Sequence, residues 1–221
     1  MKQTTLKGHF LLAMPSMGDE RFERSVIYMM AHEEEGAMGF IVNQPTQGIT
    51  LGDIGMDLPA SVGQTGLKNI PVFVGGPVEG EHGFILHSAD YPPQNPIVQE
   101  ETLVGVTQSL EILIDAAQSR GPQHMRLLLG YTGWGPGQLE GEIQENAWLT
   151  CPATLEDIFT PQPHTLYEAC IQRLGIDLAL LSHEGGEALR VSDCGGRAQK
   201  TRQAEPCRKL APRRYRPILK K

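Results

Sequence analysis

The sequence has no long hydrophobic run. Its N-terminal apolar run, residues 10–14 (FLLAM), is shorter than the ~7–15 residues of a signal-peptide core. No stretch approaches the ~18 consecutive apolar residues that a membrane-spanning helix needs. We therefore predict a protein that is neither exported nor embedded in a membrane.

Cysteine is scarce, and the histidines are scattered. The four cysteines form no CxxC pair and no Cys/His spacing typical of zinc, and a chain of this length needs no disulfides to fold. The seven histidines show no HExxH or other metal-binding spacing. Cys151 is interpreted as a buried, inert thiol, because a nucleophilic cysteine would need a base beside it. We predict a cytoplasmic protein without a metal or another cofactor.

Positive charge is nearly missing from most of the chain. Residues 189–221 hold 11 of the 19 Lys and Arg residues but only 2 of the 26 Asp and Glu residues, which leaves 8 cations against 24 anions in residues 1–188. The body therefore carries a net charge of −16 and the tail +9. An acidic body repels phosphate backbones and acidic membranes. Any nucleic-acid binding is expected only through the tail.

Apolar patterns predict strands that come in pairs. Residues 9–14 read as a first strand, and residues 25–32 and 37–43 read as a hairpin whose second arm ends at Pro45. Residues 71–74 and 83–87 suggest a second hairpin around a Gly-Gly-Pro turn. A short helix is expected near residues 51–58. The strand after the second hairpin, residues 125–129, is of the buried type.

Helical patterns come mainly in the second half of the chain. Thr107 can cap a helix whose apolar residues recur at helical spacing until Gly121. Residues 138–146 and 165–174 predict two more helices. Because strict βαβ alternation is absent, the fold class is α+β with a largely antiparallel sheet. We expect one domain over residues 1–188 and a basic, disordered extension over residues 189–221.

The segment 130–148 (GYTGWGPGQLEGEIQENAW) joins a strand to a helix through a glycine-bearing loop, which we place at residues 130–137. The N–H groups at a helix start can hold an anion. Glu140 and Glu142 would repel phosphate there, however, and no lysine follows the glycines, so a P-loop is excluded. Structural turn glycines are the favoured interpretation and ligand cradling is the alternative. Trp134 and Trp148 either anchor the helix to the core, which is favoured, or stack on a ligand.

Two further polar residues are candidate ligand contacts. His87 cannot form a triad with Ser88 and Asp90, because neighbours along a strand point to opposite faces and no GxSxG motif is present. His87 is a candidate pocket residue, with a satisfied, half-buried histidine as the favoured alternative. Asn43 either binds a ligand or caps the turn before Pro45, and the turn is favoured.

Several motifs together resemble a known family. They are HFLLAMP at residues 9–15, GAMGFIVN at 36–43 followed by Pro45, GGPV at 75–78, GFILH at 83–87, and GYxGWxxGQLExE from residue 130. In this order, over about residues 8–188, they resemble the AlgH/YqgE family of bacterial proteins. The resemblance implies an α+β domain whose mostly antiparallel, bifurcated sheet curls into a pseudo-barrel flanked by helices. Members are largely uncharacterised, one is linked by its name to regulation of alginate production, and no catalytic residue can be carried over.

The tail departs from this family. Residues 189–221 follow the motif near residues 185–188 at which members usually end. They are either a basic arm or the product of readthrough or a shifted frame.

The sequence leaves three functions open. The first is a non-catalytic binding or regulatory module that holds a small molecule or protein in a groove near Asn43, His87, Trp134 and Glu140. The second is a nucleic-acid-binding regulator that acts through the basic tail. The third is a hydrolase or transferase with a general base at Glu140 or His87. The sequence does not indicate the oligomeric state.

Overall fold

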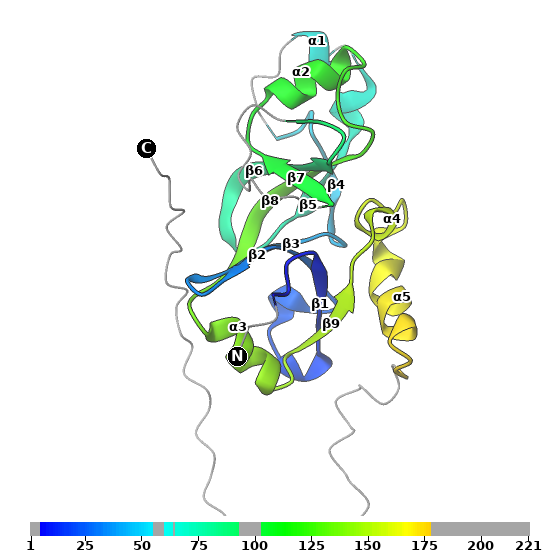
Figure 1. Ribbon diagram of the computed structural model, residues 1–221. Coiled ribbons are helices and arrows are strands. Elements are labelled where there is room, and N and C mark those ends of the chain that lie inside the picture. The colour runs from blue at the N-terminus through cyan, green and yellow to red at the C-terminus, as the bar shows by residue number, and fades with distance from the viewer. Residues whose placement is uncertain (1–4, 55–59, 64, 93–102, 178–221) are drawn as a thin grey trace, which may run out of the picture.

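The computed structural model describes residues 5–54, 60–63, 65–92 and 103–177 (Figure 1). Within these residues the strands are β1 (His9–Ala13), β2 (Val26–Glu33), β3 (Gly36–Ile41), β4 (Pro45–Thr50), β5 (Pro71–Val74), β6 (Val78–Ser88), β7 (Val104–Thr107), β8 (Met125–Trp134) and β9 (Trp148–Pro152). The α-helices are α1 (Ala60–Gly63), α2 (Glu111–Ala117), α3 (Gln138–Gln144), α4 (Leu155–Ile158) and α5 (Leu166–Arg173). Short 3-10 helices are η1 (Pro15–Met17), η2 (Glu20–Phe22), η3 (Gly66–Asn69) and η4 (Pro163–Thr165).

Strand β8 belongs to two parts of one mixed sheet. Its first half, residues 125–131, lies between β5, to which it is parallel, and β6, to which it is antiparallel. Its second half, residues 132–134, pairs with β3, from which the sheet continues through β2 and β1 to β9. We call β1, β2, β3 and β9 the lower sheet and β4 to β7 the upper sheet, as they stand in Figure 1. The predicted α+β fold with a mostly antiparallel, curled sheet is confirmed.

The first predicted hairpin is present and the second is not. Strands β2 and β3 pair antiparallel from Ile27↔Ile41 to Glu33↔Gly36, with a bulge between Met29 and Ala31. Strands β5 and β6 do not form a hairpin, because β8 lies between them and pairs with both. The prediction of a hairpin at residues 71–74 and 83–87 is therefore wrong. The apolar pattern was correct, but the partner of both strands comes some 50 residues later in the chain.

Glycines allow the chain segments to cross where β8 passes from one sheet to the other. Gly76 has φ +155° and Gly130 has φ +70°, both in the region that favours glycine. A Cβ on Gly76 would overlap the backbone of Tyr131, and one on Gly130 would overlap the Gly76 carbonyl. The predicted loop at residues 130–137 is shorter than expected, because residues 130–134 continue strand β8.

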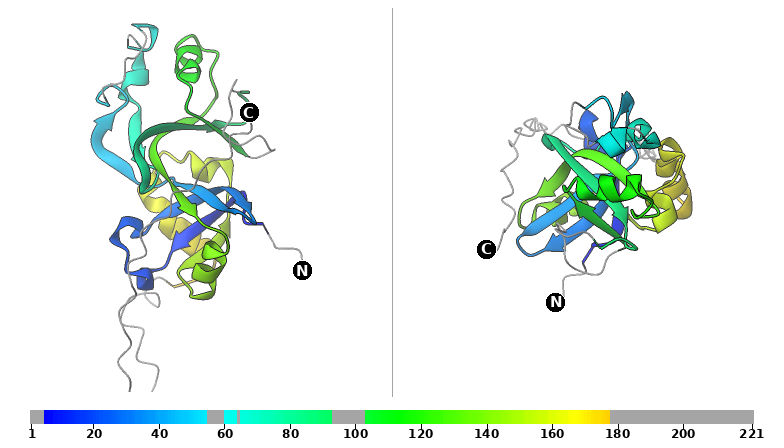
Figure 2. Two further views of the ribbon diagram at one scale, coloured as in Figure 1. Left: turned by 90° about the vertical axis from the view of Figure 1, so that its left-hand side faces the viewer. Right: turned by 90° about the horizontal axis from the view of Figure 1, so that it is seen from above.

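Three apolar cores explain why so many strands are apolar on both faces. The central core lies between the two sheets and takes alternate residues such as Phe10, Tyr28 and Phe84. The opposite face of the lower sheet packs under α3, and the opposite face of the upper sheet packs under α1 and α2. Seen from above, α2 lies across the sheet and α4 and α5 lie at its side (Figure 2).

Helices α4 and α5 close the central core on one side. Their residues Ile158, Leu166, Tyr167 and Ile171 are all at most 3% exposed and belong to the central core. The Tyr167 hydroxyl donates to the Ala13 carbonyl at 2.7 Å, which ties α5 to β1. This closure brings the segment between α4 and α5 next to the upper sheet.

Two of the predicted helices are present, and two others differ from the prediction or lie partly outside the described residues. The helices expected at 138–146 and 165–174 are confirmed as α3 and α5. The helix expected from Thr107 begins only at Glu111, because Thr107 ends strand β7 and its hydroxyl accepts from Ser109 N. Residues 51–54 form turns rather than the expected helix, and residues 55–58 lie outside the described residues, as does the predicted disordered extension. No helix in the described part of the chain is long and apolar enough to cross a membrane.

Candidate functional site

A groove of about 610 Å³ lies between the upper sheet and the segment that joins α4 to α5. One wall is formed by residues 159–165, and the other by Pro45 of β4, Pro71 and Phe73 of β5 and Arg126 of β8. Figure 1 shows α4 beside the lower ends of β4 and β5. We call this the Arg126 groove. Its volume is in the range of sites for small molecules.

Arg126 lies at the base of the groove and is only 6% exposed. Successive side chains of a strand point to opposite faces of the sheet, so Arg126 lies on the same face of β8 as the central-core residue Leu128, two positions later. Nη1 donates to the Val42 carbonyl, and Nη2 donates to the Thr160 carbonyl at 2.9 Å. Arg126 therefore connects β8, the end of β3 and the α4–α5 segment.

The charge of Arg126 has no counter-ion among the residues that the structure describes. None of the ion pairs among the described residues involves Arg126. Its guanidinium carbon instead lies 4.2 Å from the ring centroid of Phe73, a cation–π contact. Burial lowers the pKa of Arg126 to about 10, so the side chain remains a cation at neutral pH. A buried cation without a carboxylate partner is costly, and a bound anion would lower that cost.

The outer wall is stiffened by prolines. Pro161 and Pro163 restrict the backbone, and Pro163 begins η4 at the position where its missing N–H costs nothing. The Thr165 hydroxyl donates to the Gln162 carbonyl at 3.0 Å, and Gln162 N donates to the Thr160 hydroxyl at 3.2 Å. The side chains of Gln162, His164 and Thr165 are exposed at the rim. The groove therefore has a defined wall with polar groups at its opening.

Of the residues predicted from the sequence, Trp134 and Glu140 are both tied to helix α3, but by different contacts. Trp134 bonds Glu142 of the helix, and Glu140 of the helix bonds His32. Trp134 Nε1 and Trp148 Nε1 both donate to Glu142 Oε2 at 2.8 Å, and Gln138 Nε2 donates to Glu142 Oε1 at 2.8 Å. The two indoles meet edge to face at 5.9 Å between ring centroids, and each is 4% exposed. The favoured interpretation of the tryptophans as anchors of the helix agrees with this geometry. Glu142 is the shared acceptor of these hydrogen bonds.

Glu140 is held by a histidine from another strand. His32 Nε2 lies 2.9 Å from Glu140 Oε1, and Leu6 N donates to His32 Nδ1 at 3.0 Å. Because Nδ1 accepts a hydrogen bond, the ring proton is on Nε2 and is donated to Glu140. The side chain of His32 is 5% exposed and that of Glu140 is 29% exposed. The arrangement orients the carboxylate and attaches α3 to β2.

His87 and Asn43 lie elsewhere. His87 is fully buried in β6, where Nδ1 bonds the Ser88 carbonyl at 2.9 Å and Nε2 has no hydrogen-bond partner among the described residues. The sequence interpretation of a half-buried histidine is therefore wrong, and only one of the two ring nitrogens is satisfied by a described residue. Burial lowers the pKa of His87. Asn43 accepts from Val26 N at 2.8 Å and donates to the Arg24 carbonyl at 2.9 Å. The four predicted residues thus do not gather in one cleft, and none of them lines the Arg126 groove.

The sequence contains one residue that indicates the groove and that apolar patterns alone do not reveal. Arg126 is a single cation inside the buried-type run at residues 125–129. A charged residue within a buried strand is rare unless it is paired or serves a site. No cluster of three or more His, Cys, Asp or Glu side chains able to hold a metal ion occurs within the described ranges.

A family profile and the individual relatives point to the same family. The profile of a family described as AlgH-like matches residues 10–179. A UPF0301 protein of Afipia carboxidovorans is 44% identical over 192 residues, covering 84% of this chain and 91% of the relative. A UPF0301 protein of Nitrobacter hamburgensis is 43% identical, covering 84% and 89%.

Two solved structures share the fold. The solution structure of AlgH from Pseudomonas aeruginosa is similar at 37% identity and a TM-score of 0.66, covering 85% of this chain and all of that one. A crystal structure of a protein from Corynebacterium diphtheriae, at 22% identity, has a TM-score of 0.62 and covers 82% of this chain and 94% of that one.

Proposed function

The chain belongs to the AlgH-like family, and from that premise we propose that it is a non-catalytic binding or regulatory protein of the cytoplasm whose ligand occupies the Arg126 groove. The observation that carries the proposal is the buried guanidinium at the base of a concave site, which has no carboxylate partner among the described residues. A concave site with one well-placed charged group among apolar walls is typical of small-molecule recognition. The free thiols of Cys151 and Cys170 agree with a reducing compartment.

The candidate bases give less support to an enzyme. Glu140 is engaged by His32, and the free Nε2 of His87 is buried, so neither presents an accessible base in this conformation. A general base needs hydrogen-bond reach to a substrate. The nucleic-acid alternative rests on residues 189–221, which lie outside the described residues.

The proposal is tested by screening small metabolites and nucleotides against the full chain. Binding is detected as an increase in melting temperature, because a ligand that binds only the native state stabilises it by RT ln(1 + [L]/Kd). Hits are then mapped by amide chemical-shift changes, which we expect at residues 159–165 and in β5 and β8.

A matched pair of substitutions separates the groove from the rest of the surface. Gln162→Trp places a bulky ring at the rim of the groove, whereas Gln144→Trp places the same ring on exposed α3, outside the groove lining. We expect Gln162→Trp to weaken binding about tenfold or more and Gln144→Trp to leave it unchanged. Hits that shift no groove resonance, or a screen in which nothing stabilises the protein, would contradict the proposal.

A further inference from the structure

We infer that the ligand of the Arg126 groove is a small organic anion with a single carboxylate, bound at Arg126, and an apolar body that packs on the proline- and phenylalanine-rich walls. This inference rests on the proposed function and specifies its ligand.

The carboxylate is indicated by the donors that Arg126 keeps in reserve. A guanidinium has five N–H groups in a planar fork. Two of them donate to the Val42 and Thr160 carbonyls, and no other hydrogen bond joins Arg126 to a described residue. Because the two carbonyls and the Phe73 ring fix the guanidinium, the remaining donors are held in place before a ligand arrives. A preorganised fork favours a planar carboxylate, which can accept two parallel hydrogen bonds.

The single charge follows from the count of ionic groups along the groove. Among the described residues, the lining contains one arginine and one histidine, and no lysine, aspartate or glutamate. The body around it is strongly acidic, at 8 cations against 24 anions in residues 1–188. A polyphosphate needs several cations, and the surrounding field would repel it. One negative charge is what this site can neutralise.

The apolar body follows from the remaining walls. Beyond Arg126, Thr160 and the polar rim, the described lining residues are apolar side chains, among them Ile70, Phe73 and Phe159, and four prolines. The Phe159 ring is itself held by stacking on His124 at 5.5 Å between centroids. Rigid apolar walls bind a ligand body by removing its surface from water. Acetate or formate, which lack such a body, would leave these walls solvated.

The test compares probes that differ in one property, by calorimetric titration of the full chain. Phenylacetate carries the carboxylate and the apolar body, phenylacetamide lacks the charge, acetate lacks the body, and phenyl phosphate replaces the carboxylate by phosphate. AMP, which replaces both the carboxylate and the apolar body, represents nucleotides. We expect phenylacetate to bind about tenfold or more tightly than each of the others. This comparison uses the unaltered protein and does not depend on any variant folding.

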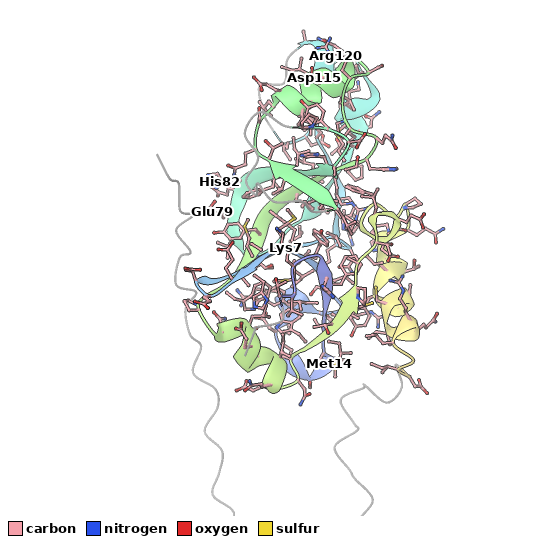
Figure 3. The ribbon with its side chains drawn as sticks, in the orientation of Figure 1. Lys7, Met14, Glu79, His82, Asp115 and Arg120 are labelled. Carbon is pink, nitrogen blue, oxygen red and sulfur yellow. The ribbon has the colours of Figure 1, made fainter. Side chains whose placement is uncertain are left out.

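Two arginine variants provide the second arm. Arg126→Lys keeps the charge but loses the fork, so we expect phenylacetate binding to fall about tenfold and the preference over phenylacetamide to shrink. Arg120→Gln is the control, because exposed Arg120, which follows α2, pairs with the partly buried Asp115 of that helix at the top of Figure 3, outside the groove lining. It should bind phenylacetate within about twofold of the unaltered chain.

The outcomes separate this inference from the proposed function. Equal binding of phenylacetate and phenylacetamide, tighter binding of phenyl phosphate or AMP, or no binding of phenylacetate at about 10 mM overturns the carboxylate inference. The proposed function survives any of these results if another compound of the metabolite screen maps to the groove. It fails with the inference if none does.

Discussion

Replacing Glu142 with alanine should destabilise the protein strongly, because one carboxylate oxygen accepts hydrogen bonds from two buried indoles. Glu142 Oε2 accepts from Trp134 and Trp148, and both tryptophans are 4% exposed. Alanine would leave two indole N–H groups without an acceptor in a place that water reaches poorly. The substitution therefore removes two part-buried hydrogen bonds from the indoles to a charged group at once, besides the exposed one from Gln138.

The magnitude follows from the cost of unpaired donors. Each buried donor left without a partner costs about 1–3 kcal/mol, so the two together should lower the free energy of unfolding by about 3–4 kcal/mol. That is a large part of the ~5–15 kcal/mol typical of a domain. Glu142→Gln keeps an acceptor oxygen and loses only the charge, and should cost about 1 kcal/mol.

The assay uses a probe that the cluster itself provides. Trp134 and Trp148 are the two tryptophans of the chain, so intrinsic fluorescence reports on this cluster alone. Urea unfolding followed by fluorescence and by far-ultraviolet circular dichroism should show the midpoint of Glu142→Ala lowered by about 1.5 M. Glu145→Ala, an exposed glutamate just after α3, should change stability by no more than about 0.5 kcal/mol.

A double-mutant cycle isolates the shared acceptor. With both tryptophans replaced by phenylalanine, Glu142→Ala should cost about 1 kcal/mol or less, because no indole N–H remains to be left unpaired. A cost below about 0.5 kcal/mol for Glu142→Ala in the unaltered chain, or an equal cost in both backgrounds, would refute the reasoning.

Three further predictions concern backbone packing, thiols and pH. Gly76→Ala should lower the free energy of unfolding by more than about 3 kcal/mol, because its Cβ would overlap β8, whereas Gly141→Ala, with open space around it inside α3, should raise it by up to about 1 kcal/mol in urea unfolding. Cys151 and Cys170, both fully buried and with the pKa of Cys170 raised to about 12 by burial, should react with a thiol reagent only as fast as the protein unfolds; immediate modification of either of these two residues in native buffer, located by peptide mass mapping to separate them from Cys194 and Cys207, would contradict this. Burial lowers the pKa of His87, so its ring should stay neutral in nuclear magnetic resonance titrations below the ordinary value of ~6.5, and the stability that it contributes should be present above that value and decline as the pH falls toward its native pKa.

The sequence predicted those elements whose partners are near in the chain. The hairpin of β2 and β3 is set by two apolar runs on either side of a short polar turn, and α3 and α5 by helical spacing of apolar residues. Strands β5 and β6 were recognised as strands but assigned to each other, because pattern alone cannot reveal that β8 inserts between them. Strand β4 was missed, since its polar, glycine-bearing sequence lies at an edge with most side chains in solvent.

The candidate site was harder to predict for a related reason. Trp134, Glu142 and Trp148 all lie within the segment 130–148, but the pattern did not reveal that one carboxylate oxygen accepts from both indoles, because that depends on how β8, α3 and β9 pack together. Arg126 becomes part of a groove only when residues 159–165 pack beside β8, and no local sequence pattern predicts that contact. The sequence shows that residue 126 is a cation, but only the fold shows that no carboxylate of the described residues pairs with it.

The central position of β8 in the sheet also affects how the chain folds during its synthesis. The ladder of β3 is completed when Ala37 pairs with Trp134, a residue that lies 97 positions later. At a synthesis rate of ~5–20 residues per second, the hairpin of β2 and β3 would wait about 5–20 s on the ribosome with one strand edge unpaired. Such an exposed edge is a site for wrong association with other chains. The nascent protein is therefore most vulnerable to aggregation during this interval, and a chaperone that shields the hairpin until β8 emerges would raise its folding yield.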